Sequence, residues 1–76
     1  MNATRRKQIA EAMTHIESAK LKLTDARDGE QEALDNMPEN LEGSERYLRM
    51  EDVVDSLDSA LDSLEEAENE IMSAMA

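Results

Sequence analysis

The chain has 76 residues, with 19 acidic against eight basic side chains, a formal net charge of −11 and no cysteine. A chain of this length forms one small domain, and its charge opposes direct binding to nucleic acid or to anionic lipid. The absence of cysteine excludes a disulfide framework and a thiolate metal cage.

The first predicted element is a helix over about residues 4–36. Seven-residue spacing gives a column of large residues and, three residues later, a column of alanines, and both are typical of a helix that packs along one stripe. The large column contains Ile9, Ile16, Leu23, Glu30 and Met37, and the alanine column contains Ala12, Ala19, Ala26 and Ala33.

A turn is predicted over residues 37–43. Pro38 cannot donate to a helical hydrogen-bond ladder and pushes Met37 out of helical geometry, so the first helix should end near Asn36. Ser44 follows Gly43 and suits the N-cap of a second helix over about residues 44–75.

The second helix repeats the pattern of the first. Its large column is Met50, Leu57, Leu64 and Ile71, and its small column is Val53, Ala60, Ala67 and Ala74. Large residues that alternate with alanine favour close helix packing. We therefore predict an all-α fold over residues 1–76, an antiparallel two-helix hairpin whose seam combines the large and alanine columns.

A further column on the second helix makes its apolar stripe wider than one partner helix covers. Its apolar members are Tyr47, Val54, Leu61 and Met75, with Glu68 among them. We expect these four residues to form a dimer interface that completes a four-helix bundle.

Residues with catalytic or metal-binding chemistry do not form a recognisable set. His15 is the only histidine and Glu30 is a single acidic residue in a seam column, whereas carboxylate metal bundles need several converging ligands. Residues 25–30 superficially resemble a calcium loop, but alignment on Gly29 places Thr24 and Ala26 at ligand positions. We expect no enzyme activity, no metal and no cofactor.

Acidic residues recur every three or four positions on the second helix, which places carboxylates about 5 Å apart along one line, on a face opposite the seam. They are Glu51, Asp55, Asp58, Asp62, Glu65 and Glu66. Two interpretations fit this line: a solvated face that maintains solubility, or a mimic of a phosphate backbone that binds a basic, nucleic-acid-binding protein. In the turn, Met37, Pro38 and Leu41 are a candidate recognition loop, and the alternative is a helix stop with the leucine packed over the hairpin end.

The stretch Glu-Gln-Glu-Ala-Leu-Asp-Asn-Met-Pro-Glu-Asn-Leu at residues 30–41, followed by Gly-Ser-Glu-Arg at 43–46 and the acidic repeat at 55–67, resembles small acidic proteins of bacterial prophages and mobile elements. The resemblance implies an accessory protein of such an element. It carries no catalytic or binding residues.

These observations together predict a non-enzymatic protein-interaction or assembly protein, with a DNA-mimic inhibitor as the alternative. We expect a homodimer, a basic protein as a further partner and no membrane association. Charges interrupt every apolar stretch at the N-terminus, so we expect a cytoplasmic location, and the resemblance implies that this is the cytoplasm of a bacterial host.

Overall fold

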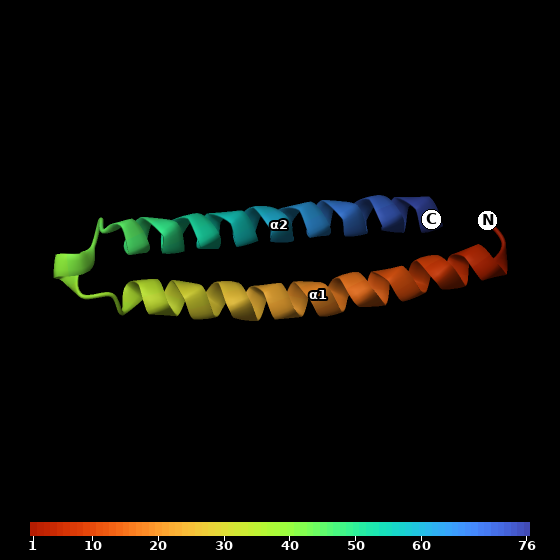
Figure 1. Ribbon diagram of the computed structural model, residues 1–76. Helices are drawn as coiled ribbons and strands as arrows, with labels where there is room; N and C mark the ends of the chain where they lie inside the picture. The colour runs from red at the N-terminus through yellow and green to blue at the C-terminus, as the bar shows by residue number, and fades with distance from the viewer.

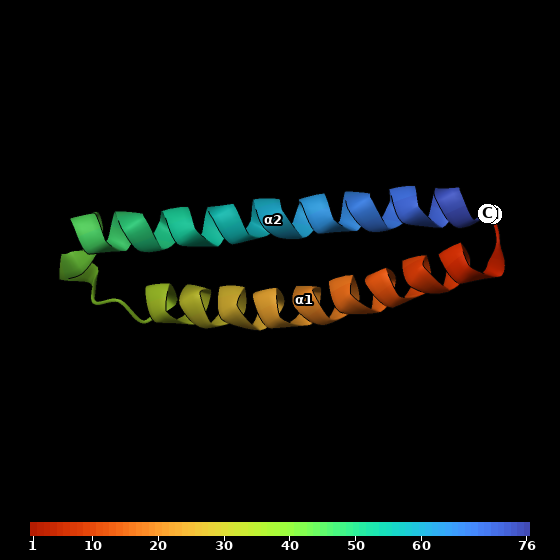
Figure 2. The same cartoon turned by 45° about the vertical axis from the view of Figure 1, so that its right-hand side comes forward.

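The computed structural model describes all 76 residues and consists of two long helices packed side by side. Helix α1 spans Ala3–Asp35, a short 3₁₀ turn η1 spans Glu39–Leu41, and α2 spans Glu45–Met75. The helices run antiparallel, and the two chain ends lie together at the end opposite the turn (Figure 1). The molecule measures 60 × 15 × 14 Å, and the second view shows the helices adjacent along their whole length (Figure 2). The predicted all-α antiparallel hairpin is confirmed.

Side-chain caps begin both helices. The Asn2 side chain accepts a hydrogen bond of 2.8 Å from the backbone N–H of Arg5, and Ser44 Oγ accepts one of 3.2 Å from the backbone N–H of Tyr47. Each cap satisfies one of the amide groups that a helix leaves unpaired at its N-terminus. The predicted N-cap at Ser44 is confirmed.

The connection between the helices is held by its own backbone. The carbonyl of Pro38 accepts from the amide of Leu41 at 2.9 Å, and the carbonyl of Leu41 accepts from the amide of Ser44 at 3.1 Å. Gly43 has a φ of +80°, a left-handed conformation that costs L-residues with a side chain about 1–2 kcal/mol. This residue reverses the chain direction immediately before the N-cap of α2.

The seam between the helices differs from the predicted one. On each helix it combines the large column with the column four residues later, and the alanine columns lie at its edge, where Ala19, Ala60 and Ala67 are half-buried and the other alanines are exposed. On α1 the half-buried residues of these two columns are Ile9, Met13, Ile16, Lys20, Leu23, Arg27, Glu30 and Leu34, and Met37 continues the large column just beyond the helix. On α2 they are Tyr47, Met50, Val54, Leu57, Leu61, Leu64, Glu68, Ile71 and Met75.

The predicted seam is therefore confirmed for the large columns, whereas the alanine columns lie at its edge and only three of the seven alanines are half-buried. The reason is geometric. At 100° per residue, a side chain four positions on lies about 40° from its reference residue, whereas one three positions on lies about 60° away in the opposite direction. The seam rotates toward the larger side chains of α2, because burying them removes more apolar area from water than burying alanine. Ala12, Ala26 and Ala33 are exposed as a result, and Val53 keeps 44% of its surface exposed.

This rotation also relocates the predicted dimer interface. Tyr47, Val54, Leu61 and Met75 face α1 within the same chain, and Val54 is only 5% exposed. One antiparallel helix thus covers this column, so the column gives no reason for a dimer. The apolar surface that remains uncovered lies on other faces.

The core of the hairpin is thin. Val54 and Glu68 are the only buried residues, and no side chain is completely enclosed. Several large apolar side chains remain in contact with solvent, among them Leu21 at 70% exposure and Met72 at 55%. A two-helix hairpin has no third layer to cover its flanks.

The two glycines make a matched test of this backbone. An added Cβ meets no neighbouring atom at either residue, but Gly29 has ordinary helical geometry and Gly43 does not. We expect Gly29→Ala to raise the free energy of unfolding by about 0.5–1 kcal/mol and Gly43→Ala to lower it by about 1–2 kcal/mol. Thermal unfolding followed by circular dichroism measures both. A similar response of the two variants contradicts the assigned turn geometry.

Candidate functional site

A charged pair lies inside the seam near its middle. Lys20 on α1 donates a hydrogen bond of 2.5 Å from Nζ to Oε1 of Glu68 on α2, and the Glu68 side chain is only 11% exposed. The hydrogen bond with Glu68 raises the pKa of Lys20, partly offset by desolvation, with further attraction from Glu68, Glu65 and Glu17. The pair fixes which turns of the two helices lie opposite one another.

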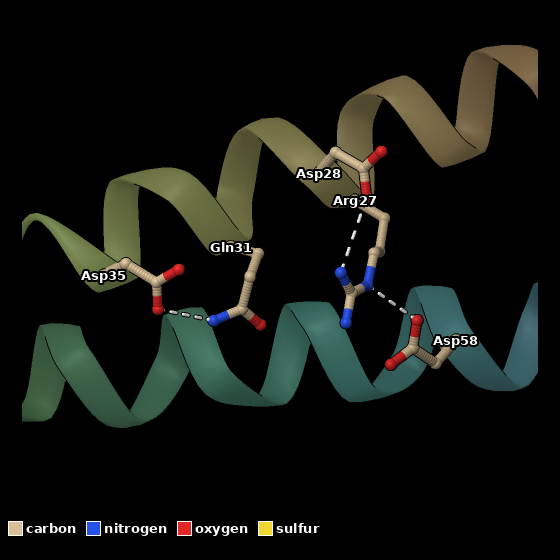
Figure 3. Close-up of polar contacts among 5 residues, drawn as sticks. All are labelled: Arg27, Asp28, Gln31, Asp35 and Asp58. Carbon is tan, nitrogen blue, oxygen red and sulfur yellow. Dashed lines mark hydrogen bonds and ion pairs between the residues drawn. The ribbon is translucent and has the colours of Figure 1, made fainter.

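A second ion pair lies about two turns nearer the connection. Arg27 Nε donates to Oδ1 of Asp58 on α2 at 2.8 Å, and its Nη1 lies 3.4 Å from Oδ1 of Asp28 on its own helix (Figure 3). The hydrogen bond with Asp58 raises the pKa of Arg27. Farther along α1, Gln31 donates to Asp35 at 2.8 Å. These contacts order one flank of the seam.

Sequence reasoning missed both interhelical pairs. The signal was present, because Lys20 and Arg27 occupy a first-helix column between Met13 and Leu34, and Glu68 occupies the equivalent column of the second helix. Opposite charges at interior positions of two antiparallel helices predict such a pair only when the register is known.

The structure divides the predicted acidic face into two groups. Asp58 is paired with Arg27 and Glu51 is half-buried, so these two lie beside the seam and not opposite it. The other four, Asp55, Asp62, Glu65 and Glu66, are exposed and form no ion pair. We use the term acidic strip for these four residues.

The end that carries both termini has its own cross-link. Arg6 donates from Nη1 to the backbone carbonyl of Met75 at 3.0 Å. The last carbonyls of a helix lack intrahelical partners and carry partial negative charge, and α2 has no basic residue in its last turn. A cation from α1 therefore caps the C-terminus of α2.

The candidate recognition loop is partly packed. Met37 is half-buried, whereas Pro38 and Leu41 are exposed, Leu41 at 44%. Nearby, desolvation and the carboxylates of Glu51, Glu42 and Asp35 raise the pKa of Tyr47. Because Leu41 is exposed, its side chain is accessible to a binding partner.

No enclosed site accompanies these features. The larger surface depression, about 350 Å³, is lined by four residues of α1 alone: Glu17, Lys20, Leu21 and Thr24. His15 is exposed, Glu30 is half-buried in the seam, and no three acidic or histidine side chains are grouped to hold a metal ion. Side chains from one helix line an open surface and do not surround a substrate.

The alanine columns form one continuous face of the hairpin. They are displaced from the seam in the same rotational sense on both helices, and because the helices run antiparallel this displacement leads to the same side of the pair. Arg27, Asp58 and the carboxylates near Lys20 lie on the opposite side. We use the term alanine face for Ala12, Ala19, Ala26, Ala33, Val53, Ala60, Ala67 and Ala74.

Comparison of the chain with family models, with curated proteins and with solved structures finds no match. Neither helix is long and apolar enough to cross a membrane.

The Lys20–Glu68 pair makes a testable contribution to stability. Lys20→Met leaves the Glu68 carboxylate buried without its partner, so we expect a clear fall in melting temperature. Glu68→Met should cost less, because the Lys20 side chain is 31% exposed and its ammonium group can turn to water. The double variant should match or exceed the wild-type melting temperature. Additive losses in the double variant contradict an interaction between these two residues.

Proposed function

We propose that this chain is a non-enzymatic helical interaction protein that uses the alanine face to pack against another protein. The observation that supports this function is a face of seven alanines and one valine, five of them exposed and three half-buried, beside a core with only two buried residues. Small side chains allow helix axes to approach within about 8 Å, which brings many atoms into contact at little cost in side-chain entropy.

The hairpin gains stability from such a partner. A monomeric hairpin leaves its flanks in water, and a protein layer over the alanine face adds buried apolar area. The resemblance of residues 30–46 and 55–67 to small acidic proteins of prophages and mobile elements supports a role as an assembly or accessory protein of such an element.

The experiment compares two equal changes at exposed positions of α1. Ala26→Glu places a charge on the alanine face, whereas Ser18→Glu places one on a side that faces neither α2 nor the alanine face. We expect the first variant to lose association at least tenfold and the second to keep it, because an unpaired charge in a close helix contact is strongly unfavourable.

Association is measured by light scattering of the purified protein and by recovery of proteins on the tagged chain. Circular dichroism confirms that both variants remain helical. A wild-type chain that stays monomeric at high micromolar concentration and also recovers no protein refutes this function, and so does equal association of the two variants.

A second function, inhibition of a basic nucleic-acid-binding protein by DNA mimicry, is supported by the acidic strip. Its exposed carboxylates form no ion pair within the chain, although Glu65 lies near Lys20, and regularly spaced negative charge attracts the surfaces that bind phosphate backbones.

Neutralising Asp55, Asp62 and Glu66 to Asn or Gln tests this function and leaves the Arg27–Asp58 pair intact. The fold should become slightly more stable, since like charges at i,i+4 cost roughly 0.2–0.5 kcal/mol each. Recovery of a basic partner at about 0.1 M salt should be lost with this variant. The matched control neutralises three acids of α1, Glu11, Asp25 and Glu32, and should keep the partner. Equal recovery by both variants identifies the acidic strip as solvated surface.

A further inference from the structure

The two columns of the alanine face share one centre. The α1 column is centred between Lys22 and Leu23, and the α2 column between Ser63 and Leu64. The first centre follows Lys20 by two to three residues and the second precedes Glu68 by four to five, so the Lys20–Glu68 pair places the two centres within about 3 Å of one level along the hairpin.

This coincidence makes the alanine face complementary to itself. A twofold axis across the hairpin at that level brings Ala12 opposite Ala33 of a second copy, and Ala19 opposite Ala26. It does the same on the other helix, where Ala60 meets Ala67 of the second copy. One symmetry operation thus superimposes small residues on small residues along both helices, as a twofold interface requires.

The charge of the hairpin distinguishes this arrangement from its parallel counterpart. Residues 23–63, the half on the turn side of that level, carry thirteen acidic and three basic side chains, net −10, and the remaining residues carry six and five, net −1. Parallel docking places the two −10 halves together. Antiparallel docking places each of them against a −1 half, which lowers the repulsion between copies.

Individual cations support the antiparallel arrangement. Arg5 continues the alanine column of α1 one heptad before Ala12, so the twofold axis places it over the acidic turn of the second copy, near Glu39 and Glu42. Arg46 occupies the equivalent position on α2. It lies opposite the C-terminal end of α2 of the second copy, where the helical carbonyls are negative and the last turn of α2 has no basic residue of its own, Arg6 of α1 being the one cation already there.

The area of the face is sufficient for a dimer. From Ala12 to Ala33 the column extends about 32 Å, and two helices side by side give it a width of about 20 Å. The contact buries on the order of 600 Å² per copy, or about 1,200 Å² in total, which reaches the lower end of specific protein interfaces.

We propose that the partner of the alanine face is a second copy of this chain, docked antiparallel to form a four-helix bundle with the turns at opposite ends. This inference rests on the proposed function and names its partner. The acidic strips lie away from the contact in this bundle and remain in solvent.

Single cysteines test the arrangement cleanly, because the chain has none of its own. Ser63 borders the alanine face at the level of the twofold axis, so Ser63→Cys should join two copies upon mild oxidation or with a short bismaleimide. Ser56→Cys is the matched control, since it lies one heptad away on the same flank. The axis separates its two copies by 15 residues of helix, about 22 Å, beyond the reach of a disulfide.

We expect most of the Ser63→Cys protein to migrate as a covalent dimer, with at least tenfold less from Ser56→Cys, and light scattering of the uncrosslinked wild type to give twice the monomer mass. A dimer that Ser63→Cys fails to trap, or that both variants trap equally, overturns the antiparallel arrangement. A wild-type monomer overturns the whole inference. If that monomer still recovers another protein, and Ala26→Glu abolishes the recovery, the proposed function stands without a self-partner.

Discussion

The ion pair between Lys20 and Glu68 lies near the middle of the interface between α1 and α2. Two helices alone cannot surround a charged pair with apolar side chains, and Lys20 accordingly keeps 31% of its side chain in solvent while Glu68 is nearly covered. Because each charge is costly to leave unpaired, the two residues must lie opposite each other. That requirement sets the register of every other layer of the seam.

The register also determines what remains outside. When Lys20 and Glu68 face each other, the seam uses the columns that contain them, and the alanine columns rotate onto one flank of the hairpin. The register that the Lys20–Glu68 pair sets therefore leaves the alanine face on the outside of the hairpin. Arg27 and Asp58 occupy the opposite flank and make it polar. The two flanks have different chemistry, and a partner that packs by close helix contact can use only one of them.

Much of the fold follows from local chemistry. Seven-residue spacing predicts both helices, Pro38 and Gly43 mark the connection, and Ser44 caps α2, because each signal depends on a few neighbouring residues. The seam could not be assigned in the same way. On each helix, either the alanine column or the column four residues after the large one could complete the seam. Which of them does so depends on the apolar area and the charges of the facing helix. A lysine alone argues against a seam position, and Lys20 occupies one because Glu68 of α2 lies opposite it.

The candidate site was predicted less well, for the same reason. The acidic residues of α2 were identified from spacing alone, but spacing does not show that Asp58 has a cation beside it or that Glu51 is half-buried. What distinguishes the remaining carboxylates is their lack of an intramolecular partner, which only the packed hairpin reveals.

The two proposed functions do not compete for surface. A net charge of −11 per chain opposes association of identical copies, so a dimer needs a contact region where charge is sparse. The alanine face provides one, while the acidic strip projects from another side of α2. Docking through the alanine face would give a dimer two acidic strips, and a basic protein that meets two of them gains from bivalency without any new contact. Self-association and binding of a basic partner are therefore separable by mutation, since each depends on residues that the other leaves in solvent.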